Sequence, residues 1–400
     1  MADSQNKKLP KGWRMVRFGD VVRDVNEAER NPPGAGLERY VGLEHIEPEN
    51  LHLKAWGDLT TDEVSFTKRF RKGQVLFGKR RAYQRKVAVA EFDGICSSDI
   101  LTFEPKDDAL LPDLLPFIVQ SEGFFEHALG TSSGSLSPRT RWNQLQDYQF
   151  PLPPKDEQRR IAEILWASDA LRESTIVLID RLRIARDTLF EGALKDAEMR
   201  ETCSRTIRLR ECCERVTDGT HIPPPFSEEG VPFFLVKTIS SGTVDWSHTK
   251  FVSQDTYQDL TRTIRPSRGH VLYTVVGATY GVAVLVDFDE PFVFQRHIAH
   301  LIPSPEVLDA HFLTFYLNSR AGKRQADQSA IGTAQPTITL RDLGRFQLPG
   351  LPLQEQQRLV KMVSRFDCAI AKSEANLDTL RSATRGIVSC ALFGNQRPKE

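Results

Sequence analysis

A run of basic side chains lies between Lys68 and Lys86, where nine basic residues occur and no acidic one. Its second part, GKRRAYQRK at residues 78–86, places one aromatic ring and one amide among five of these charges. Arginine can donate two hydrogen bonds to guanine, glutamine can pair in the same way with adenine, and lysine neutralises phosphate. The run therefore predicts a contact with nucleic acid, although a solvated basic hairpin would have the same composition.

The corresponding stretch in the second half of the chain, TVVGATYG at residues 274–281, has no charged side chain. Basic residues lie nearby instead, at Arg262, Arg265, Arg268 and His270. We infer that the two halves contact different sequences. The charge is then local, which reconciles the basic run with a formal net charge of zero. The candidate nucleic-acid contacts are Lys79, Arg80, Arg81, Tyr83, Gln84, Arg85, Lys86, Arg139, Arg141, His221, Lys237, Arg262, Arg265, Arg268, Thr279 and Tyr280.

Two groups of these candidates have a plain structural alternative. Arg139 and Arg141 follow a Gly134-Ser135 loop that returns in the second half as Gly332-Thr333. Their position allows a phosphate contact, but a loop kept in both copies is better explained by a fixed junction between globule and helix. His221, which follows Asp218-Gly219-Thr220, either approaches nucleic acid or caps a turn.

The elements that must position these residues occur twice. A shift of 198 residues, without a gap, superimposes the segment beginning PLPPKDEQRR at Pro151 on the segment beginning PGLPLQEQQR at Pro349. The shift pairs Glu157-Gln158 with Glu355-Gln356 and Asp169 with Asp367. A repeat of this length indicates a duplicated domain, because solenoid repeats are only about 20–50 residues long.

Both repeated segments continue as long amphipathic helices with an apolar seam. The predicted seam positions are Ile161, Ile164, Ser168, Leu171, Thr175, Leu178, Leu182, Ala185 and Leu189 in the first copy, and Leu359, Met362, Phe366, Ala369, Ser373, Asn376, Leu380, Ala383 and Ile387 in the second. Alternating steps of three and four residues are typical of coiled coils. A helix of roughly forty residues is about 60 Å long. We expect the two seams to pack antiparallel, because the intervening globule then joins adjacent helix ends. An ordinary helical hairpin is the alternative.

The globules that precede the helices are predicted to be α+β. Short apolar runs at residues 39–43, 75–77 and 87–90 indicate strands, whereas residues 114–119 and 312–317 indicate short helices. The expected architecture is two similar globular domains separated by a coiled-coil spacer of two long antiparallel helices, with a pseudo-two-fold repeat. The expected boundaries are 1–151, 152–198, 199–348 and 349–400.

Composition excludes several classes of protein. Hydrophobic residues make up 40% of the chain and charged residues 26%, as in soluble globular domains. No apolar run approaches the ~18 residues of a membrane span, and the first residues lack the apolar core of a secretion signal. Six cysteines show neither metal spacing nor scaffold density, which fits a reducing cytoplasm.

No motif for catalysis or for a bound metal is visible. The chain has neither a GxxxxGK[ST] phosphate loop nor a GxGxxG turn after a strand. Asp93, Asp99 and Glu104, with Lys106 after them, do not form an ordered nuclease triad. His297 and His300 lack partners at ligand spacing. We therefore expect no catalytic residue, no metal and no cofactor on this chain.

Three segments resemble one known family. The opening LPKGWRMVRFGDV, the PLPP…EQRRIAEIL block that begins at Pro151 and the VTDGTH stretch that begins at Val216 are similar to the specificity (S) subunits of type I restriction–modification enzymes. The resemblance covers essentially the whole chain. It implies two target recognition domains that each bind one part of a bipartite, asymmetric DNA site, with no catalytic site of their own.

The resemblance also implies partners. The helices would act as a spacer and as a docking surface for two methyltransferase (M) subunits, and motor-nuclease (R) subunits would complete the complex. S-adenosylmethionine, ATP and magnesium would then bind to those partners. The expected docking and spacer residues are Glu157, Gln158, Ile161, Leu171, Leu182, Glu355, Gln356, Leu359, Phe366 and Leu380. The second copy departs from the pattern at Leu351 and at Leu353-Gln354, which stand where the first copy has Pro153 and Lys155-Asp156. A scaffold of two protein-interaction domains, or a DNA reader of another defence system, remains the alternative.

Overall fold

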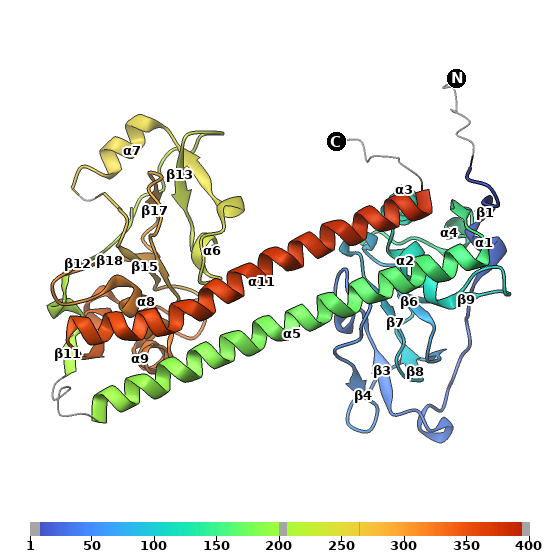
Figure 1. Cartoon of the computed structure of the whole chain (residues 1–400), viewed down its shortest axis with the longest axis horizontal. Helices are drawn as coiled ribbons and strands as arrows, with labels where there is room; N and C mark the ends of the chain where they lie inside the picture. Colours follow the sequence, from blue (N-terminus) through green and yellow to red (C-terminus); the bar gives the residue numbers. More distant parts are fainter. Residues whose placement is uncertain (1–8, 136, 200–205, 264, 394–400) are drawn as a thin grey trace. The chain divides into compact units, whose positions relative to one another are not determined.

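The computed structural model describes residues 9–135, 137–199, 206–263 and 265–393, and the chain divides into two compact units (Figure 1). Unit 1 comprises Met1–Val177 and Glu374–Glu400, and unit 2 comprises Leu178–Ser373. Residues 1–8, 136, 200–205, 264 and 394–400, among them Cys203, lie outside the described residues. No helix of the described part of the chain is long and apolar enough to cross a membrane.

Unit 1 contains three sheets. One has the order β2(Val22–Asp24)-β9(Ile100–Pro105)-β6(Val75–Gly78)-β7(Val87–Val89) and is antiparallel throughout. A second has the order β4(Gly57–Asp58)-β3(Arg39–Val41)-β8(Gly94–Cys96)-β5(Lys68–Phe70), in which β3 and β8 are parallel. The third pairs β1(Arg14–Arg17) with β10(Gln149–Leu152), directly before the first long helix.

Unit 2 repeats this topology strand for strand, apart from β5. Its sheets have the orders β12(Cys213–Asp218)-β18(Ile298–Pro303)-β15(Val271–Thr274)-β16(Ala283–Leu285), β14(Lys250–Val252)-β13(Val231–Phe234)-β17(Val293–Phe294) and β11(Thr206–Arg208)-β19(Gln347–Pro349). Here β13 and β17 form the parallel pair. The sequence repeat is therefore a repeat of the whole domain, and the predicted α+β class is confirmed.

Short helices cover the sheets within each unit. The α-helices of unit 1 are α1 (Phe18–Val21), α2 (Leu115–Gln120), α3 (Glu122–Gly130) and α4 (Trp142–Leu145), and those of unit 2 are α6 (Val236–Ile239), α7 (Gln254–Leu260), α8 (Ala310–Asn318), α9 (Arg320–Ser329) and α10 (Leu340–Leu343). The 3-10 helices are η1 (Pro33–Ala35), η2 (Leu43–His45), η3 (Ala82–Gln84), η4 (Pro112–Leu114), η5 (Leu209–Glu211) and η6 (Trp246–His248). Both short helices predicted from sequence are present, as α2 and α8.

An aromatic core holds the central strand of unit 1. Phe77 of β6 stacks on Phe103 of β9 at 5.8 Å between ring centroids and meets Phe124 of α3 edge-on at 5.5 Å. All three rings are fully buried, and such pairs contribute about 0.5–1.5 kcal/mol each beyond their buried area. Burial of Phe77 and Val87 fixes both ends of the loop that carries the basic run, which spans residues 79–86.

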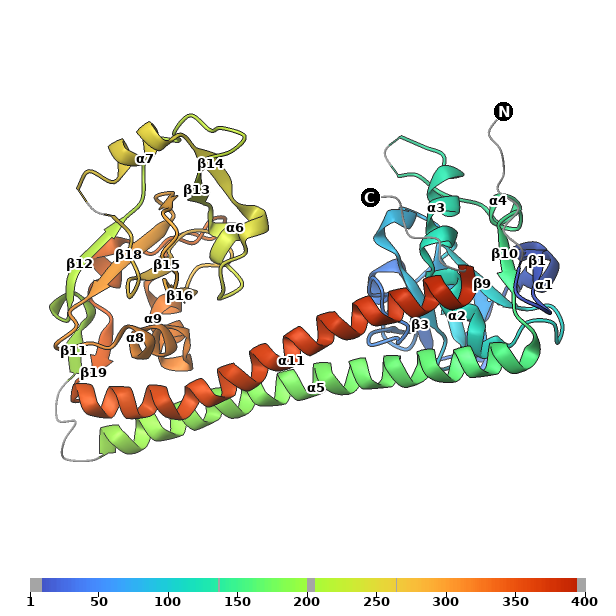
Figure 2. The ribbon, with the colours of Figure 1, turned by 45° about the horizontal axis from the view of Figure 1, so that its top comes forward.

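The two long helices, α5 (Lys155–Met199) and α11 (Leu353–Phe393), are continuous in the structure (Figure 2). Within unit 1, Ser168 and Thr384 share a hydrogen bond of 2.6 Å between their hydroxyls. Within unit 2, Arg186 Nη1 donates to Asp367 Oδ1 at 2.7 Å. The early part of α5 thus pairs with the late part of α11, and the late part of α5 with the early part of α11. The predicted antiparallel pairing is confirmed.

The buried seam of each helix differs from the predicted seam by one residue at alternate positions. Ile161, Ser168 and Leu359 face inward as predicted, but Leu171 is 53% exposed. The shielded residues that replace predicted positions are Leu165, Arg172, Ile179, Arg186 and Phe190 on α5 and Val363, Ile370, Leu377 and Thr384 on α11. Neighbouring apolar pairs such as Ile164-Leu165 offered two choices. The second was selected because Leu165, Phe190 and Val363 also pack into the globular cores of their own units.

Gln158 and Gln356 fix the start of each helix to the adjacent globule. The side chain of Gln158 is buried, accepts a hydrogen bond from Leu111 N at 2.9 Å and donates to the carbonyls of Ala109 and Pro153. Gln356 repeats the arrangement with Asp309 N and the carbonyls of Val307 and Leu351. These two amides were expected to contact a partner subunit, but their hydrogen-bonding groups are used inside the fold. The neighbouring Glu157 and Glu355 are partly exposed and pair with Arg160 and Arg358.

We expect Gln356→Ala to lower the free energy of unfolding of unit 2 by about 2 kcal/mol, because it leaves buried backbone groups without partners. Gln357→Ala is the matched control, since Gln357 is the next residue on α11 and is exposed. It should change stability by less than about 0.5 kcal/mol. Urea unfolding of the two variants measures the difference, and equal losses would contradict the role assigned to Gln356.

Candidate nucleic-acid interface

The predicted basic loop pairs with the loop that contains Gly134. The corresponding two loops of unit 2 pair in the same way. Hairpin loop 1 (residues 79–86) joins β6 to β7, and glycine loop 1 (residues 133–135 and 137–139) precedes α4. Arg81 N donates to Pro138 O at 2.8 Å, and Thr140 N donates to Lys79 O at 3.1 Å. We call these two loops, with the turn at residues 97–99, platform 1.

Unit 2 forms the same platform from its own residues. Hairpin loop 2 (residues 275–282) joins β15 to β16 and pairs with glycine loop 2 (residues 331–337). Gly277 N donates to Pro336 O at 2.9 Å, and Ile338 N donates to Val275 O at 2.8 Å. With the turn at residues 295–297, these loops make platform 2. Backbone hydrogen bonds build both platforms, so their side chains are free to differ.

Glycine is present in both glycine loops for a steric reason. Gly134 has φ +111° and Gly332 has φ +94°, a region that residues with a Cβ rarely adopt. The loop was expected to fix the junction between globule and helix. The structure places it beside the hairpin loop instead, where it supports the candidate contact residues. Arg141 follows the loop and is the N-cap residue of the short helix α4.

A single carboxylate organises the arginines of platform 1. Asp99 accepts two hydrogen bonds from Arg139, at 2.9 and 3.3 Å, and lies 3.6 Å from Arg80 Nη1. Arg80 also donates to Ser137 Oγ at 3.2 Å. The hydrogen bond from Arg139 lowers the pKa of Asp99 despite partial burial, so Asp99 stays ionised near neutral pH. Two arginines around one carboxylate leave a net positive charge on an exposed surface.

Some of the remaining side chains of hairpin loop 1 contact other parts of unit 1, and the others are exposed to solvent. Arg85 pairs with Glu122 at 2.6 Å, and its guanidinium lies over the ring of Phe125 at 4.8 Å. Lys86 Nζ donates to Leu43 O at 2.6 Å, and burial lowers the pKa of Lys79. Tyr83 is 55% exposed at the tip, with Gln84 beside it.

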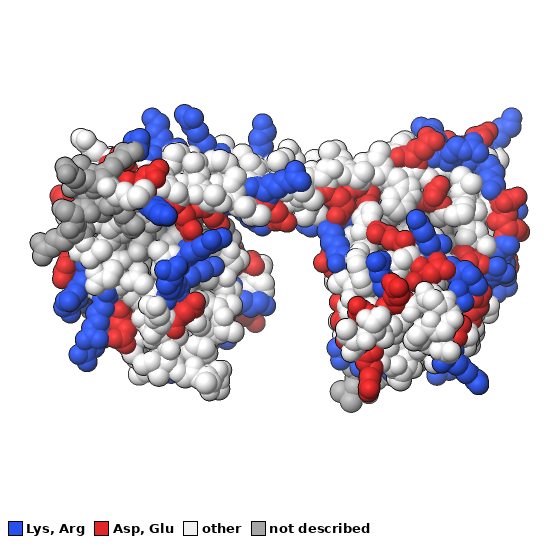
Figure 3. Space-filling model, turned by 90° about the horizontal axis from the view of Figure 1, so that it is seen from below, with Lys and Arg blue, Asp and Glu red and all other residues white. Residues whose placement is uncertain are grey.

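The basic run is therefore largely paired inside unit 1. Lys68 is buried against Asp24 at 3.0 Å, and Arg71 pairs with Glu27 at 3.0 Å. On the face shown in Figure 3, the basic side chains of unit 1, at the right, alternate with acidic ones. The charge run in the sequence overstated the free positive surface, because its counterions come from distant parts of the chain. Arg80, Arg81, Tyr83, Gln84 and Arg139 remain as the candidate contacts of platform 1.

Platform 2 has the same backbone and different chemistry. The positions of Arg80, Asp99 and Arg139 in platform 1 are taken by Val276, His297 and Thr337 in platform 2. Thr279 is exposed, and the hydroxyl of Tyr280 donates to Asp327 Oδ1 at 2.8 Å. Arg296 is exposed beside His297, and burial, with the nearby Arg296, lowers the pKa of that imidazole. Among the described residues of platform 2, Arg296 is therefore the one that carries a full charge.

Of the other second-half candidates, His221 follows a residue that is hydrogen-bonded to platform 2. Thr220 pairs with Gln295, and Arg296 N donates to Thr220 O at 3.0 Å, so the segment before His221 backs the turn at residues 295–297. His221 itself pairs with Asp218 at 3.1 Å. The rest lie on other segments of unit 2: Lys237 in α6, Arg262 paired with Asp259, Arg265 over the ring of Tyr257 and Arg268 paired with Asp289.

Sequence reasoning did not include Asp99, Ser137 and Arg296 among the candidate residues, although all three lie on the platforms. The repeat itself offered a signal, since the 198-residue shift aligns Asp99 with His297 and Arg139 with Thr337. A paired difference of this kind marks a position at which two copies of one site have diverged. Within the described ranges, no group of three or more His, Cys, Asp or Glu side chains is placed to hold a metal ion.

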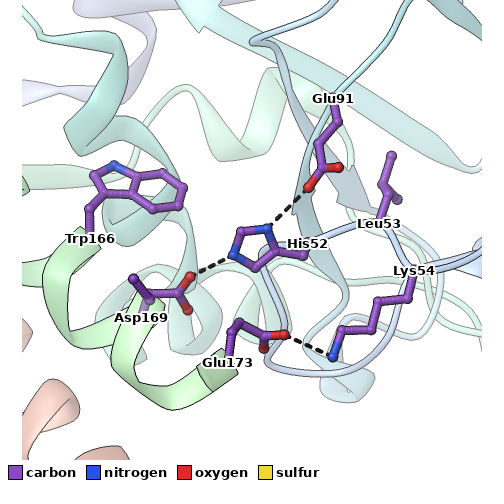
Figure 4. Close-up of a pocket in the computed structure, with 8 residues that line it drawn as sticks. His52, Leu53, Lys54, Glu91, Trp166, Asp169 and Glu173 are labelled. Atoms are coloured by element: carbon purple, nitrogen blue, oxygen red, sulfur yellow. Dashed lines mark hydrogen bonds and ion pairs between the residues drawn. The ribbon is translucent and has the colours of Figure 1, made fainter. Parts of the chain in front are cut away.

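A second polar cluster joins the globule of unit 1 to α5. His52 lies between Glu91 and Asp169, at 3.0 and 2.7 Å, and Lys54 pairs with Glu173 at 2.9 Å (Figure 4). These residues line a hollow of about 500 Å³ whose remaining wall includes Trp166. Partial burial lowers the pKa of His52, but the hydrogen bonds to Glu91 and Asp169 outweigh that effect and leave the pKa raised.

The comparisons identify the family. A family model described as the type I restriction modification DNA specificity domain matches residues 10–179 and 230–380. The chain belongs to this family. The two matched ranges contain hairpin loops 1 and 2 and both glycine loops, so the platforms lie within the specificity domains.

Known relatives match most of the chain at low identity. The MjaVIII specificity subunit of Methanocaldococcus jannaschii is 22% identical over 98% of this chain and 95% of its own length. The EcoBI specificity subunit of Escherichia coli is 25% identical over 68% of this chain and 65% of its own length. The S subunit of a type I system from M. genitalium shares the fold with a TM-score of 0.55 at 16% identity, covering 98% of this chain and 99% of that one. A chain from a structure of type I R-M complex assembly gives a TM-score of 0.59 at 22% identity, covering 96% of this chain and 98% of that one.

The raised pKa of His52 sets the sign of a pH effect. Protonated His52 is favoured in the folded state, so its contribution to stability is complete below the unfolded pKa and is lost as pH rises through the folded pKa. Between about pH 6 and pH 8, the wild-type chain should lose stability relative to His52→Gln, by less than about 1 kcal/mol because the pairs are partly solvated. Thermal unfolding at several pH values tests this, with His311→Gln as the control. A difference that does not change with pH would contradict it.

Proposed function

We propose that this chain is the DNA specificity subunit of a type I restriction–modification complex and that it reads a bipartite, asymmetric site. Platform 1 contacts one half-site and platform 2 the other. The observation that carries this proposal is that two copies of one backbone platform present different side chains. Arg80, Arg139 and Gln84 suit base edges and phosphates, whereas Thr279, Arg296 and His221 offer a different set of donors.

The helices supply the remaining parts of the proposal. Paired α5 and α11 set the spacing between half-sites and dock two methyltransferase subunits, and motor-nuclease subunits join them. The partly exposed Glu157 and Glu355 and the exposed Leu171 are the docking candidates, since Gln158 and Gln356 are used within the fold. Methylation and cleavage occur on the partners, which bind S-adenosylmethionine, ATP and magnesium, and this chain contributes no catalytic residue. The complex works in the cytoplasm on double-stranded DNA.

Co-expression with the methyltransferase subunit of the same system, in a host without DNA methylation, tests the function. Single-molecule sequencing should show modified adenines in one bipartite, asymmetric motif with a fixed gap, and none when this chain is absent. A stable complex of the two proteins that adds no sequence-specific methylation would refute the proposal and favour a scaffold.

Arg139 offers a sharper test of platform 1. Arg139→Gln should weaken binding of the cognate duplex and, if the guanidinium contacts phosphate, lower the salt slope of log K by about 0.9. Arg17→Gln is the matched control, because both arginines pair with one aspartate and their side chains are similarly exposed, at 47% and 51%. Binding titrations across salt concentrations measure both variants. Equal losses in the two would place the DNA elsewhere than platform 1.

A further inference from the structure

Hairpin loops 1 and 2 follow the same unusual backbone path with different residues. Arg81 and Arg85 have φ +53° and +52°, and the equivalent residues of hairpin loop 2, Gly277 and Gly281, have φ +95° and +85°. Left-handed backbone is readily adopted by glycine and is unfavourable for arginine. Hairpin loop 2 therefore holds its shape by residue type, whereas hairpin loop 1 needs support from its surroundings.

The arginines bracket the exposed tip of platform 1. Between them, η3 (Ala82–Gln84) carries Tyr83 and Gln84. The direction of these two side chains depends on the conformation at both ends of this turn. Any contact that holds Arg85 in its left-handed conformation consequently positions the tip.

Glu49 provides that support from the side of the globule. It too has a left-handed backbone, with φ +56°. Its N–H donates to Arg85 O at 3.1 Å, and its carboxylate lies 3.5 Å from Arg85 Nε. The neighbouring residues Pro48 and Lys86 form a backbone bridge. Glu49 therefore contacts hairpin loop 1 through both its backbone and its side chain.

Both long helices reach Glu49 within unit 1. Arg385 of α11 donates to both carboxylate oxygens, at 2.9 and 2.8 Å. Arg172 of α5 donates to Glu49 O at 3.2 Å. A chain of contacts therefore runs from each helix through Glu49 to Arg85 and the tip. Hairpin loop 2 has glycine at both left-handed positions, Gly277 and Gly281, so its backbone path does not need such a contact.

We infer that Glu49 is a positioning residue that couples hairpin loop 1 to α5 and α11, so that sequence reading by unit 1 depends on the helix pair and reading by unit 2 does not. This inference rests on the proposed DNA-reading function and adds to it a regulation of one half-site. A methyltransferase subunit that shifts the helices on docking would alter discrimination at the half-site of platform 1 alone.

The experiment separates the helix contact from the loop. Arg385→Gln removes the contact from α11 without changing platform 1, and Arg385→Lys retains its charge. Arg381→Gln is the matched control, because Arg381 lies one turn earlier on α11 and pairs with Asp378 at 3.4 Å. Glu49→Gln removes the same ion pairs from the other side and serves as the second variant. Each chain is assayed in complex with its methyltransferase, on the cognate duplex and on duplexes with single substitutions in either half-site.

Arg385→Gln and Glu49→Gln should each lower discrimination against wrong bases about fivefold or more in one half-site, the same one for both, with the other unchanged. Arg385→Lys should restore discrimination, and Arg381→Gln should match wild type. Unchanged discrimination, or equal losses in both half-sites, would overturn the coupling. A wild-type complex without a bipartite motif would instead overturn the proposed function itself.

Discussion

The backbone pairing between hairpin loop and glycine loop is the interaction on which both candidate sites depend. The pairing is made by backbone N–H and C=O groups. In each unit one glycine, Gly134 or Gly332, allows the backbone of the glycine loop to turn. The pairing between the two loops therefore does not require particular side chains at the surface. This is the physical condition under which one fold can carry two different specificities, and the exchange of Arg80, Asp99 and Arg139 for Val276, His297 and Thr337 shows its result.

Most charges of the basic run are paired within unit 1. The basic run meets carboxylates from many parts of the chain, including Asp24, Asp99 and Glu122. An arginine that is already fixed by an ion pair loses less conformational freedom on binding a ligand than an unpaired arginine does. A paired platform also suits sequence reading better than a uniformly positive surface, which binds phosphates regardless of sequence.

The long helices pack into the globular core of each unit, and they also pair with each other. Gln158 and Gln356 tie the first turns to the globules, and Leu165, Phe190 and Val363 enter the globular cores. The contacts of His52 and Glu49 with α5 and α11 extend this connection in unit 1. The two copies have therefore diverged in their attachment to the helices as well as in their surface chemistry.

The sequence by itself determined the duplication, the α+β class, the two long helices with their antiparallel pairing, and the location of the candidate loops. These follow from periodicity, from the 198-residue repeat and from turn residues, all of which are visible locally or by comparing two similar copies. The seam of the helices was predicted only in part, because Ile164-Leu165 and Leu189-Phe190 offer an apolar side chain at both choices and the globular cores decide between them. The tertiary structure alone decided which charges pair and which remain exposed. Asp99 meets Arg139 and Glu49 meets Arg385 across 40 and 336 residues of sequence, and no local pattern encodes a partner at that distance.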